Sequence, residues 1–261
     1  MRAQARAPRH LALLPALLVT SALAWIATSV SADPAMRLGI LTGAADRSMD
    51  DVAMASVDPP LAFALFMATW TLMMVAIMFP AVAPVVMTFD RWALAKSRPR
   101  SVTAAFLAGY LAIWSAIGLA AYGAVLAIEA FVPAGDPSAP RIGGVLLAAA
   151  GVYELTPLKD LCLQHCRSAV ATIVQYADRL SDGHRGPFTV GVLHGIYCVG
   201  CCWSLMLVLV LVGMMNLVWM GIIAALIFAE KVLPGGRVLS RIAGVALIGA
   251  GAFLAIGWPA V

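Results

Sequence analysis

The stretch FTVGVLHGIYCVGCCWSLMLVLVLVG, residues 188–213, decides the fold class of this chain. It contains no Asp, Glu, Lys or Arg, and it exceeds the roughly 20 apolar residues that one helical membrane crossing requires. Only a helix can satisfy every backbone polar group of such a segment in lipid. The stretch therefore predicts a transmembrane helix, and three of the five cysteines of the chain lie within it.

Similar apolar segments lie on both sides of this stretch, separated by Ser, Gly, Pro and charged clusters. The seven predicted spans lie near residues 11–30, 61–88, 102–132, 142–158, 188–213, 215–232 and 238–256. Pro80 and Pro84 fall late in the second span, where they predict a kink or an early exit from the helix. The sequence thus predicts an all-α fold, a polytopic transmembrane helical bundle of about seven spans.

The composition supports this fold class and excludes others. The chain has 261 residues, of which 62% are hydrophobic and 11% charged, and its mean hydropathy is +0.94. A typical soluble domain is about 25% charged, and disordered chains have few apolar residues, so both classes are excluded. A net charge of +4 leaves no dense basic face, so nucleic acid is not an expected partner. The expected partner is the lipid bilayer.

The basic residues predict the orientation in the membrane. All but three of the 17 lysines and arginines precede the first predicted span or lie in every second connection after it. Because cytoplasmic loops carry an excess of Lys and Arg, this bias places the N-terminus and these connections in the cytoplasm. We therefore expect a multi-pass protein with a cytoplasmic N-terminus.

The chain divides into three parts. Residues 1–32 form an N-terminal transmembrane anchor or a signal-like segment, with a basic start and a possible cleavage site at Val30-Ser31-Ala32. The apolar run is long for a signal peptide, so a retained anchor is favoured; cleavage would leave six spans. Residues 33–60 form an acidic external loop, and residues 61–258 form a single helical membrane domain.

Two Cys/His motifs carry the predicted chemistry. The cysteines and histidines at helical spacing are Cys162, His165, Cys166, His194, Cys198, Cys201 and Cys202. Within each motif the offsets are three, four, seven or eight residues, which places its members on one face of a helix. Thiolate and imidazole together suit Cu(I) or Zn(II) and not Mg or Ca, whereas the alternative reading is a face of small packing residues. Metal binding is the preferred interpretation, and the two motifs form either one shared site or two sites in a relay.

Methionine favours copper over zinc, because thioethers select Cu(I). Possible auxiliary ligands are Met67, Met74, Met78 and Met206, although methionine also fills gaps in apolar cores. Glu154 lies about mid-span, where a carboxylate is costly and needs a role: a metal ligand, a proton acceptor or a partner of Lys159. Glu230 and Lys231 are expected to snorkel to the cytoplasmic surface. His184, in a polar loop, is expected to be exposed.

Three functions follow from these motifs. The preferred one is copper handling, either transport or delivery to a cuproprotein, with a metallochaperone or the recipient cuproprotein as possible protein partner. A membrane thiol–disulfide oxidoreductase would use Cys198 with Cys201 or Cys202, whose spacing is compatible with redox work. A zinc-stapled structural membrane protein is the third. Enzymatic activity is not favoured, and the sequence predicts no catalytic residue.

The motifs resemble those of a bacterial family of predicted metal-binding integral membrane proteins, a domain of unknown function. The resemblance rests on three blocks that begin at Trp70, Tyr153 and His194 and end at Pro80, Ser168 and Lys231. The matching region covers roughly residues 60–235; Ala169 departs from the proline expected there. The resemblance implies metal binding and a location in the bacterial inner (cytoplasmic) membrane, but it implies no activity.

Overall fold

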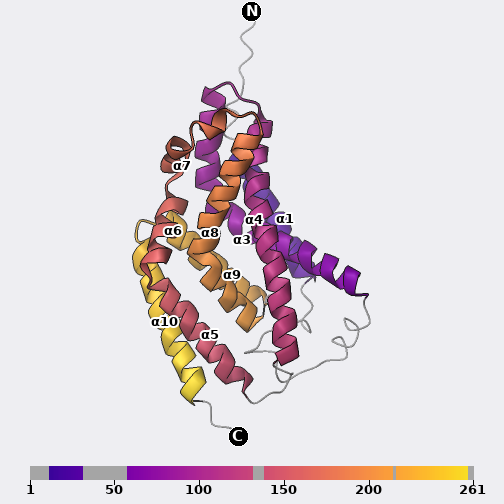
Figure 1. Ribbon diagram of the computed structural model, residues 1–261, viewed down its shortest axis with the longest axis vertical. Coiled ribbons are helices and arrows are strands. Elements are labelled where there is room, and N and C mark those ends of the chain that lie inside the picture. Colours follow the sequence, from indigo (N-terminus) through magenta and orange to yellow (C-terminus); the bar gives the residue numbers. More distant parts are fainter. Residues whose placement is uncertain (1–11, 32–57, 132–137, 214–215, 258–261) are drawn as a thin grey trace, which may run out of the picture.

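The fold is built from helices throughout the part of the chain that the computed structural model describes, residues 12–31, 58–131, 138–213 and 216–257 (Figure 1). Within these ranges no strand is present. The helices are α1 (Leu13–Ser31), α3 (Pro59–Ala95), α4 (Arg100–Phe131), α5 (Ala139–Glu154), α6 (Pro157–Arg167), α7 (Ala169–Gln175), α8 (Arg185–Val212), α9 (Leu217–Val232) and α10 (Gly236–Gly257), with a 3-10 turn at Arg179–Ser181. The predicted all-α class is confirmed. The predicted acidic loop lies almost entirely outside the described residues.

Five of these helices are long and apolar enough to cross a membrane: α1, α3, α4, α8 and α10. Helices α5 and α9, each of 16 residues, correspond to predicted spans but are shorter than the roughly 20 residues of a full crossing. The structure therefore supports five candidate spans, and the number seven stays a prediction.

Helix α3 continues through Pro80 and Pro84 to Ala95, so the predicted early exit is wrong. Figure 1 shows its two ends running in different directions, as expected for a helix with internal prolines. The α3–α4 turn and the start of α8 lie at the upper end of the molecule in this view, and the end of α4 and the start of α5 lie at the lower end. The two ends of α4 thus lie at opposite ends of the molecule.

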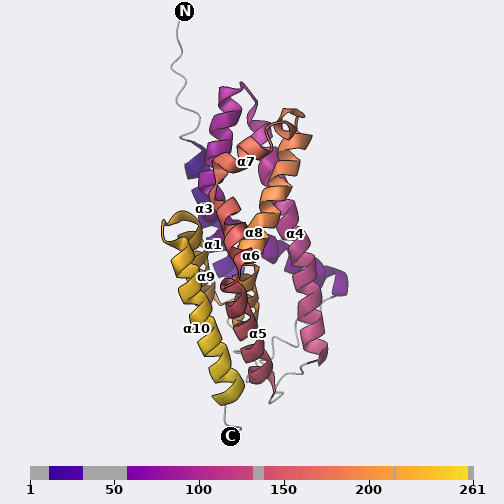
Figure 2. The same cartoon turned by 60° about the vertical axis from the view of Figure 1, so that its left-hand side comes forward.

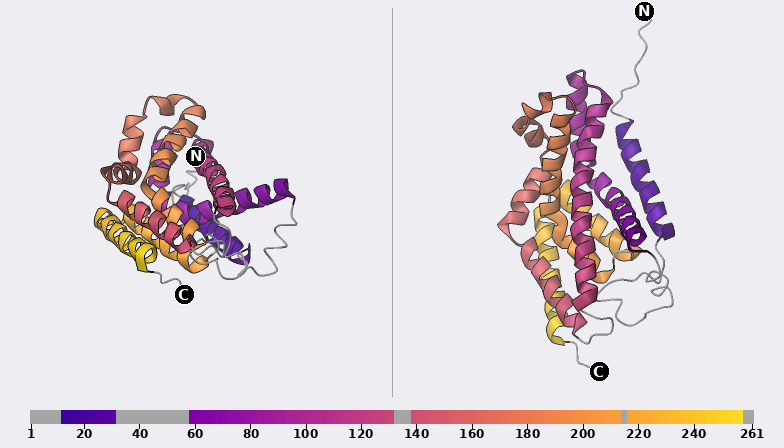
Figure 3. Two further views of the ribbon diagram at one scale, coloured as in Figure 1. Left: turned by 60° about the horizontal axis from the view of Figure 1, so that its bottom comes forward. Right: turned by 45° about the vertical axis from the view of Figure 1, so that its right-hand side comes forward.

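Helix α8 is the central element, in contact with α4, α5, α6 and α9. Its approach to α4 depends on Gly109 and Gly191, because a Cβ at either position would collide with backbone of the facing helix. Helices α5 and α10 pack along their lengths at one side of the molecule (Figure 2), while α1 lies along α3 at another (Figure 3, right). These contacts leave the middle of α8 buried.

A break between α5 and α6 gives the second motif its own helix. Helix α5 ends at Glu154, and Thr156 caps α6 by accepting a hydrogen bond from the Lys159 backbone N–H, at 3.3 Å. Pro157 takes the first position of α6, where its missing N–H costs nothing. The predicted span 142–158 therefore ends earlier, and α6 packs against α8 as a separate helix.

Candidate metal centre

Helix α8 presents its four predicted ligands to the interior. His194, Cys198, Cys201 and Cys202 are all buried. The thiols of Cys201 and Cys202 donate hydrogen bonds to the backbone carbonyl of Cys198, at 3.1 and 2.8 Å. The helical spacing in the sequence correctly indicated that these residues share the inner face.

Helix α6 adds a further thiol, that of Cys166, to this face. The sulfur atoms of Cys166, Cys198 and Cys201 all lie within 4.8 Å of one another, and Cys166 and Cys201 are 3.4 Å apart. All five cysteines are free thiols. Of the two arrangements that the sequence left open, the geometry favours a shared site between the two motifs.

Cys162 and His165 lie at the edge of this group. Cys162 is buried against α8 at Gly200, where a Cβ would lie 2.6 Å from its sulfur. His165 faces elsewhere: its ring stacks on Tyr197 with the centroids 4.4 Å apart, and its Nδ1 lies 2.9 Å from the Leu161 carbonyl oxygen. The structure therefore places Cys162 against the same stretch of α8 as the thiol group and leaves His165 outside that group.

His194 is buried beside the aromatic residues of α4. Its ring centroid lies 5.9 Å from that of Phe106 and 6.2 Å from that of Tyr110. The Tyr110 hydroxyl lies 3.0 Å from the sulfur of Cys198, within hydrogen-bond distance. Tyr110 thus supports the central cysteine from α4, a contact that the sequence gave no reason to expect.

The ammonium group of Lys231 lies among sulfur atoms, which the sequence analysis missed. Its Nζ is 2.9 Å from Cys198 Sγ, 3.8 Å from Met78 Sδ and 3.9 Å from Cys202 Sγ. The residue is 8% exposed and its neighbour Glu230 is 1% exposed. The expectation that both side chains snorkel to the surface is wrong, because the last turn of α9 packs against α3, α6 and α8.

Among the predicted methionine ligands, Met78 is the one beside the site, with its sulfur 3.8 Å from Lys231 Nζ. Met74 and Met206 are buried in the same core and Met67 is half-buried. The stripe therefore contributes mainly to core packing, with one member beside the thiols.

A second buried network, of carboxylates, lies next to the thiols. Lys159 Nζ contacts Glu154 Oε2 at 2.5 Å and Glu230 Oε2 at 2.8 Å. Ser204 donates a hydrogen bond to Glu154 Oε1 and Ser240 donates to Oε2, so both oxygens of Glu154 are engaged. Of the three roles considered for Glu154, the partnership with Lys159 is confirmed.

This network fixes α6 in place. Its members come from α5, α6, α8, α9 and α10, and Arg167 at the end of α6 donates to the carbonyls of Glu230 and Leu233. Glu230 Oε1 is buried without a hydrogen-bond partner. The ion pairs of Lys159 near the start of α6 and the hydrogen bonds of Arg167 at its end thus hold Cys166 against α8.

The environment of α6 shifts the pKa of three of its side chains, Cys166, Cys162 and Lys159. Burial raises the pKa of the Cys166 thiol well above its ordinary value, with further contributions from Cys198 and Cys201. Burial also raises the pKa of Cys162. For Lys159 burial lowers the pKa, but Glu230 and Glu154 together outweigh it and the net pKa is raised. Without metal, therefore, Cys166 is a protonated thiol near neutral pH and Lys159 is an ammonium.

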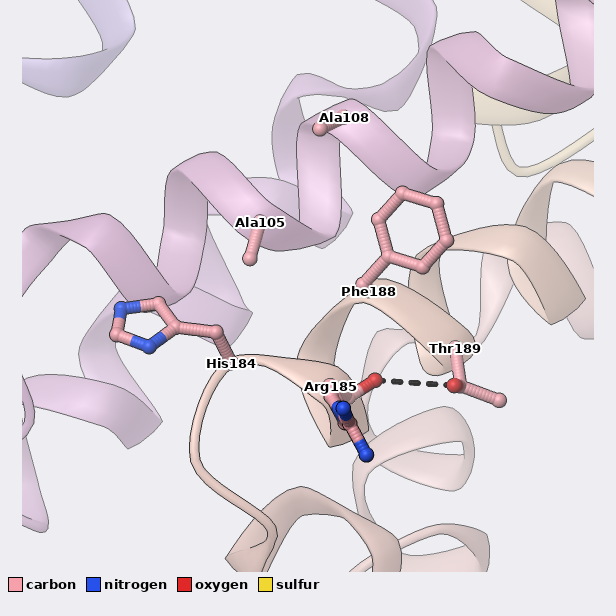
Figure 4. Close-up of a pocket in the computed structure, with 6 residues that line it drawn as sticks. All are labelled: Ala105, Ala108, His184, Arg185, Phe188 and Thr189. Carbon is pink, nitrogen blue, oxygen red and sulfur yellow. Dashed lines mark hydrogen bonds between the residues drawn. The ribbon is translucent and has the colours of Figure 1, made fainter.

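A shallow groove of about 510 Å³ lies between α4 and the start of α8, away from the thiols (Figure 4). His184, Arg185 and Phe188 line it with alanines of α4. His184 is exposed, as expected, and its Nε2 lies 2.7 Å from Ser101 Oγ. The groove has no thiol, so the candidate metal centre lies in the buried interior.

Comparisons with known proteins support a role in copper handling. Neither the curated proteins nor the solved structures gave a match to this chain. A family model described as "PpoB2: Copper chaperone" matches residues 67–254, a region that contains every cysteine. Because the match covers well over half of its length, the chain belongs to the PpoB2 family of copper chaperones.

Proposed function

We propose that this protein is an integral membrane protein that binds Cu(I) through buried thiols and delivers it to a cuproprotein. The observation that carries the proposal is the group of three sulfur atoms from Cys166, Cys198 and Cys201. The family description supports copper as the cargo. The five long apolar helices support a membrane location.

The donor set fits a soft monovalent ion. Two sulfurs bound to one ion at about 2.3 Å are at most about 4.6 Å apart, close to the 4.8 Å limit on the separations observed here. Thiolate ligands select Cu(I), and Cys202, Cys162 and His194 lie nearby as further donors. Met78, beside Lys231, supplies a thioether at the border of the site. Zinc would use the same thiols, and is the alternative metal.

The proposed orientation follows the basic residues. The turn between α3 and α4 and the segment before α8 contain arginines and lie at the same end of the molecule (Figure 1). With that end in the cytoplasm, the N-terminus is cytoplasmic and the protein lies in the bacterial inner membrane. Copper is then bound within the helical bundle, beneath that end.

We favour delivery over transport because the family is described as a chaperone. Delivery requires ligand exchange with a recipient cuproprotein or a metallochaperone. Transport of copper across the membrane, thiol–disulfide exchange and a zinc staple are the alternatives that an experiment must separate.

Copper retention by purified protein tests the proposal. Detergent-solubilised protein is dialysed against a competing Cu(I) chelator, and bound copper, bound zinc and free thiols are counted. We expect copper on the wild type and on His184→Ala, whose side chain is exposed, and a large loss on Cys198→Ser. Stoichiometric zinc in protein as isolated, with no copper retained, would support the structural staple.

A disulfide between Cys198 and Cys201 or Cys202 in protein quenched directly from cells, with no copper retained, would instead support the oxidoreductase. Delivery itself is tested by mixing copper-loaded protein with an apo-cuproprotein from the same cell. We expect copper to appear in the recipient faster than it is released to buffer.

A further inference from the structure

The position of Lys231 brings a fixed positive charge into a site for a positive ion. Its Nζ lies 2.9 Å from the sulfur of Cys198, the residue at the centre of the thiol group, and 3.9 Å from the sulfur of Cys202. A buried ammonium needs a compensating partner, and the hydrogen-bond acceptors around Lys231 Nζ are sulfur atoms. Lys231 is therefore part of the immediate environment of any ion that Cys198 binds.

The backbone around Lys231 is held in place. The side chain of Glu230 accepts from Lys159, and the carbonyl of the same residue accepts from Arg167, at 2.8 Å each. At the other end of α9, Asn216 caps the helix by accepting from the N–H groups of Val218 and Trp219. Because both ends of α9 are fixed, the ammonium cannot withdraw from the sulfurs by moving the helix.

A fixed charge of +1 discriminates between ions of different charge. If a metal binds Cys198 at about 2.3 Å, it lies at most about 5 Å from the ammonium. At that distance the two cations repel, and the repulsion of a divalent ion is twice that of a monovalent ion. The ammonium also stabilises the thiolate of Cys198, but for an equal number of thiolates this benefit is the same for both ions.

We propose that Lys231 determines metal selectivity: its ammonium group makes the thiol site prefer monovalent Cu(I) over divalent ions such as Zn(II). The inference rests on the proposed function, since it assumes that Cys198 binds the metal. It adds the discrimination that the thiols alone lack, because thiolates and imidazole also suit Zn(II).

The test compares the ratio of Cu(I) to Zn(II) affinity in wild type, Lys231→Leu and Lys231→Arg. Each affinity is measured by competition with a chelator of known strength, on full-length protein in detergent. We expect Lys231→Leu, which adds no metal ligand, to shift the ratio toward Zn(II) by at least about tenfold, because the charge is lost. Lys231→Arg keeps the charge and should stay within about threefold of the wild-type ratio.

An unchanged ratio in Lys231→Leu, with copper still bound, would overturn the selectivity role and leave the proposed function standing. Failure of the wild type itself to bind Cu(I) would overturn the proposed function. Lys231→Gln is measured in parallel, so that a folding defect of the leucine variant does not decide the outcome. A fall in the ratio of Cu(I) to Zn(II) affinity in Lys231→Arg as large as in the neutral variants would also contradict the inference. The positive charge would then not be the cause of the selectivity.

Discussion

Two lysines are buried in this molecule, and their partners differ. Lys159 lies between two carboxylates, at 2.5 and 2.8 Å, whereas Lys231 lies among the sulfurs of Cys198, Cys202 and Met78. The carboxylates of Glu154 and Glu230 lie outside the thiol group, so the first lysine would keep the same partners when an ion binds there. Thiols gain and lose charge with protons and metal, so the partners of the second change with the state of the site. The first region therefore builds the fold, and the second is the one that a bound ion would change.

The largest expected effect comes from breaking the carboxylate region. Lys159→Met leaves two buried carboxylates without their shared cation, and should lower the free energy of unfolding by about 3–5 kcal/mol. Denaturant unfolding in detergent measures this. The triple variant that adds Glu154→Gln and Glu230→Gln removes the uncompensated charges and should recover part of the loss. A single variant as stable as the wild type would show that the network is not needed for the fold.

The thiol region should show the opposite pattern, a large effect on metal and a small one on stability. Cys198→Ser removes the central sulfur and is expected to lower Cu(I) affinity at least about 100-fold. The free energy of unfolding should change by no more than about 1 kcal/mol. Chelator competition and denaturant unfolding of the same preparation give both values. Full copper occupancy in this variant would place the metal elsewhere.

The pH dependence sharpens the contrast further. Because burial raises the pKa of Cys166, its thiol is protonated near neutral pH and must release a proton when it binds Cu(I). Below that pKa the affinity should fall about tenfold per pH unit for each proton released. Cys166→Ser should reduce this slope by about one proton. If the wild type and the variant show the same slope between pH 6 and 8, Cys166 is not a ligand.

The smallest effect is expected at His165, which the sequence placed among the ligands. Its ring stacks on Tyr197 and lies outside the group of three thiols, so His165→Ala should change Cu(I) affinity by less than about threefold. His194→Ala, at a buried position beside Tyr110, is the matched comparison and should have the larger effect. If His165→Ala lowered Cu(I) affinity as much as Cys198→Ser does, α6 would have to rotate when metal binds.

Much of the fold could be predicted because apolar length and Gly, Pro and charged breaks are local properties. The helices follow the predicted segments, and even the break before α6 had signals in Thr156 and Pro157. The inner face of α8 was predictable from the spacing of Cys198, Cys201 and Cys202 alone. In each case the argument needed one helix and no knowledge of its neighbours.

The missed features depend on contacts between helices. Nothing local distinguishes a lysine that snorkels from one that turns inward, so Lys231 required the position of α9 against α3 and α8. The contact of Tyr110 with Cys198 joins residues 88 positions apart and has no sequence pattern. His165 has the same helical spacing as Cys162 and Cys166, yet its ring stacks on Tyr197.

The Lys159–Glu230 pair has a consequence for how the protein is made. The two residues are 71 positions apart, so Lys159 emerges from the ribosome long before its second partner exists. The thiols of α6 and α8 are likewise synthesised before Lys231. Until α9 has been synthesised, the nascent chain contains the cysteines without the ammonium beside them and without the Lys159–Glu230 pair that holds α6. Loading during synthesis would thus meet an unfinished and less discriminating set of thiols, and correct metallation belongs to the completed chain.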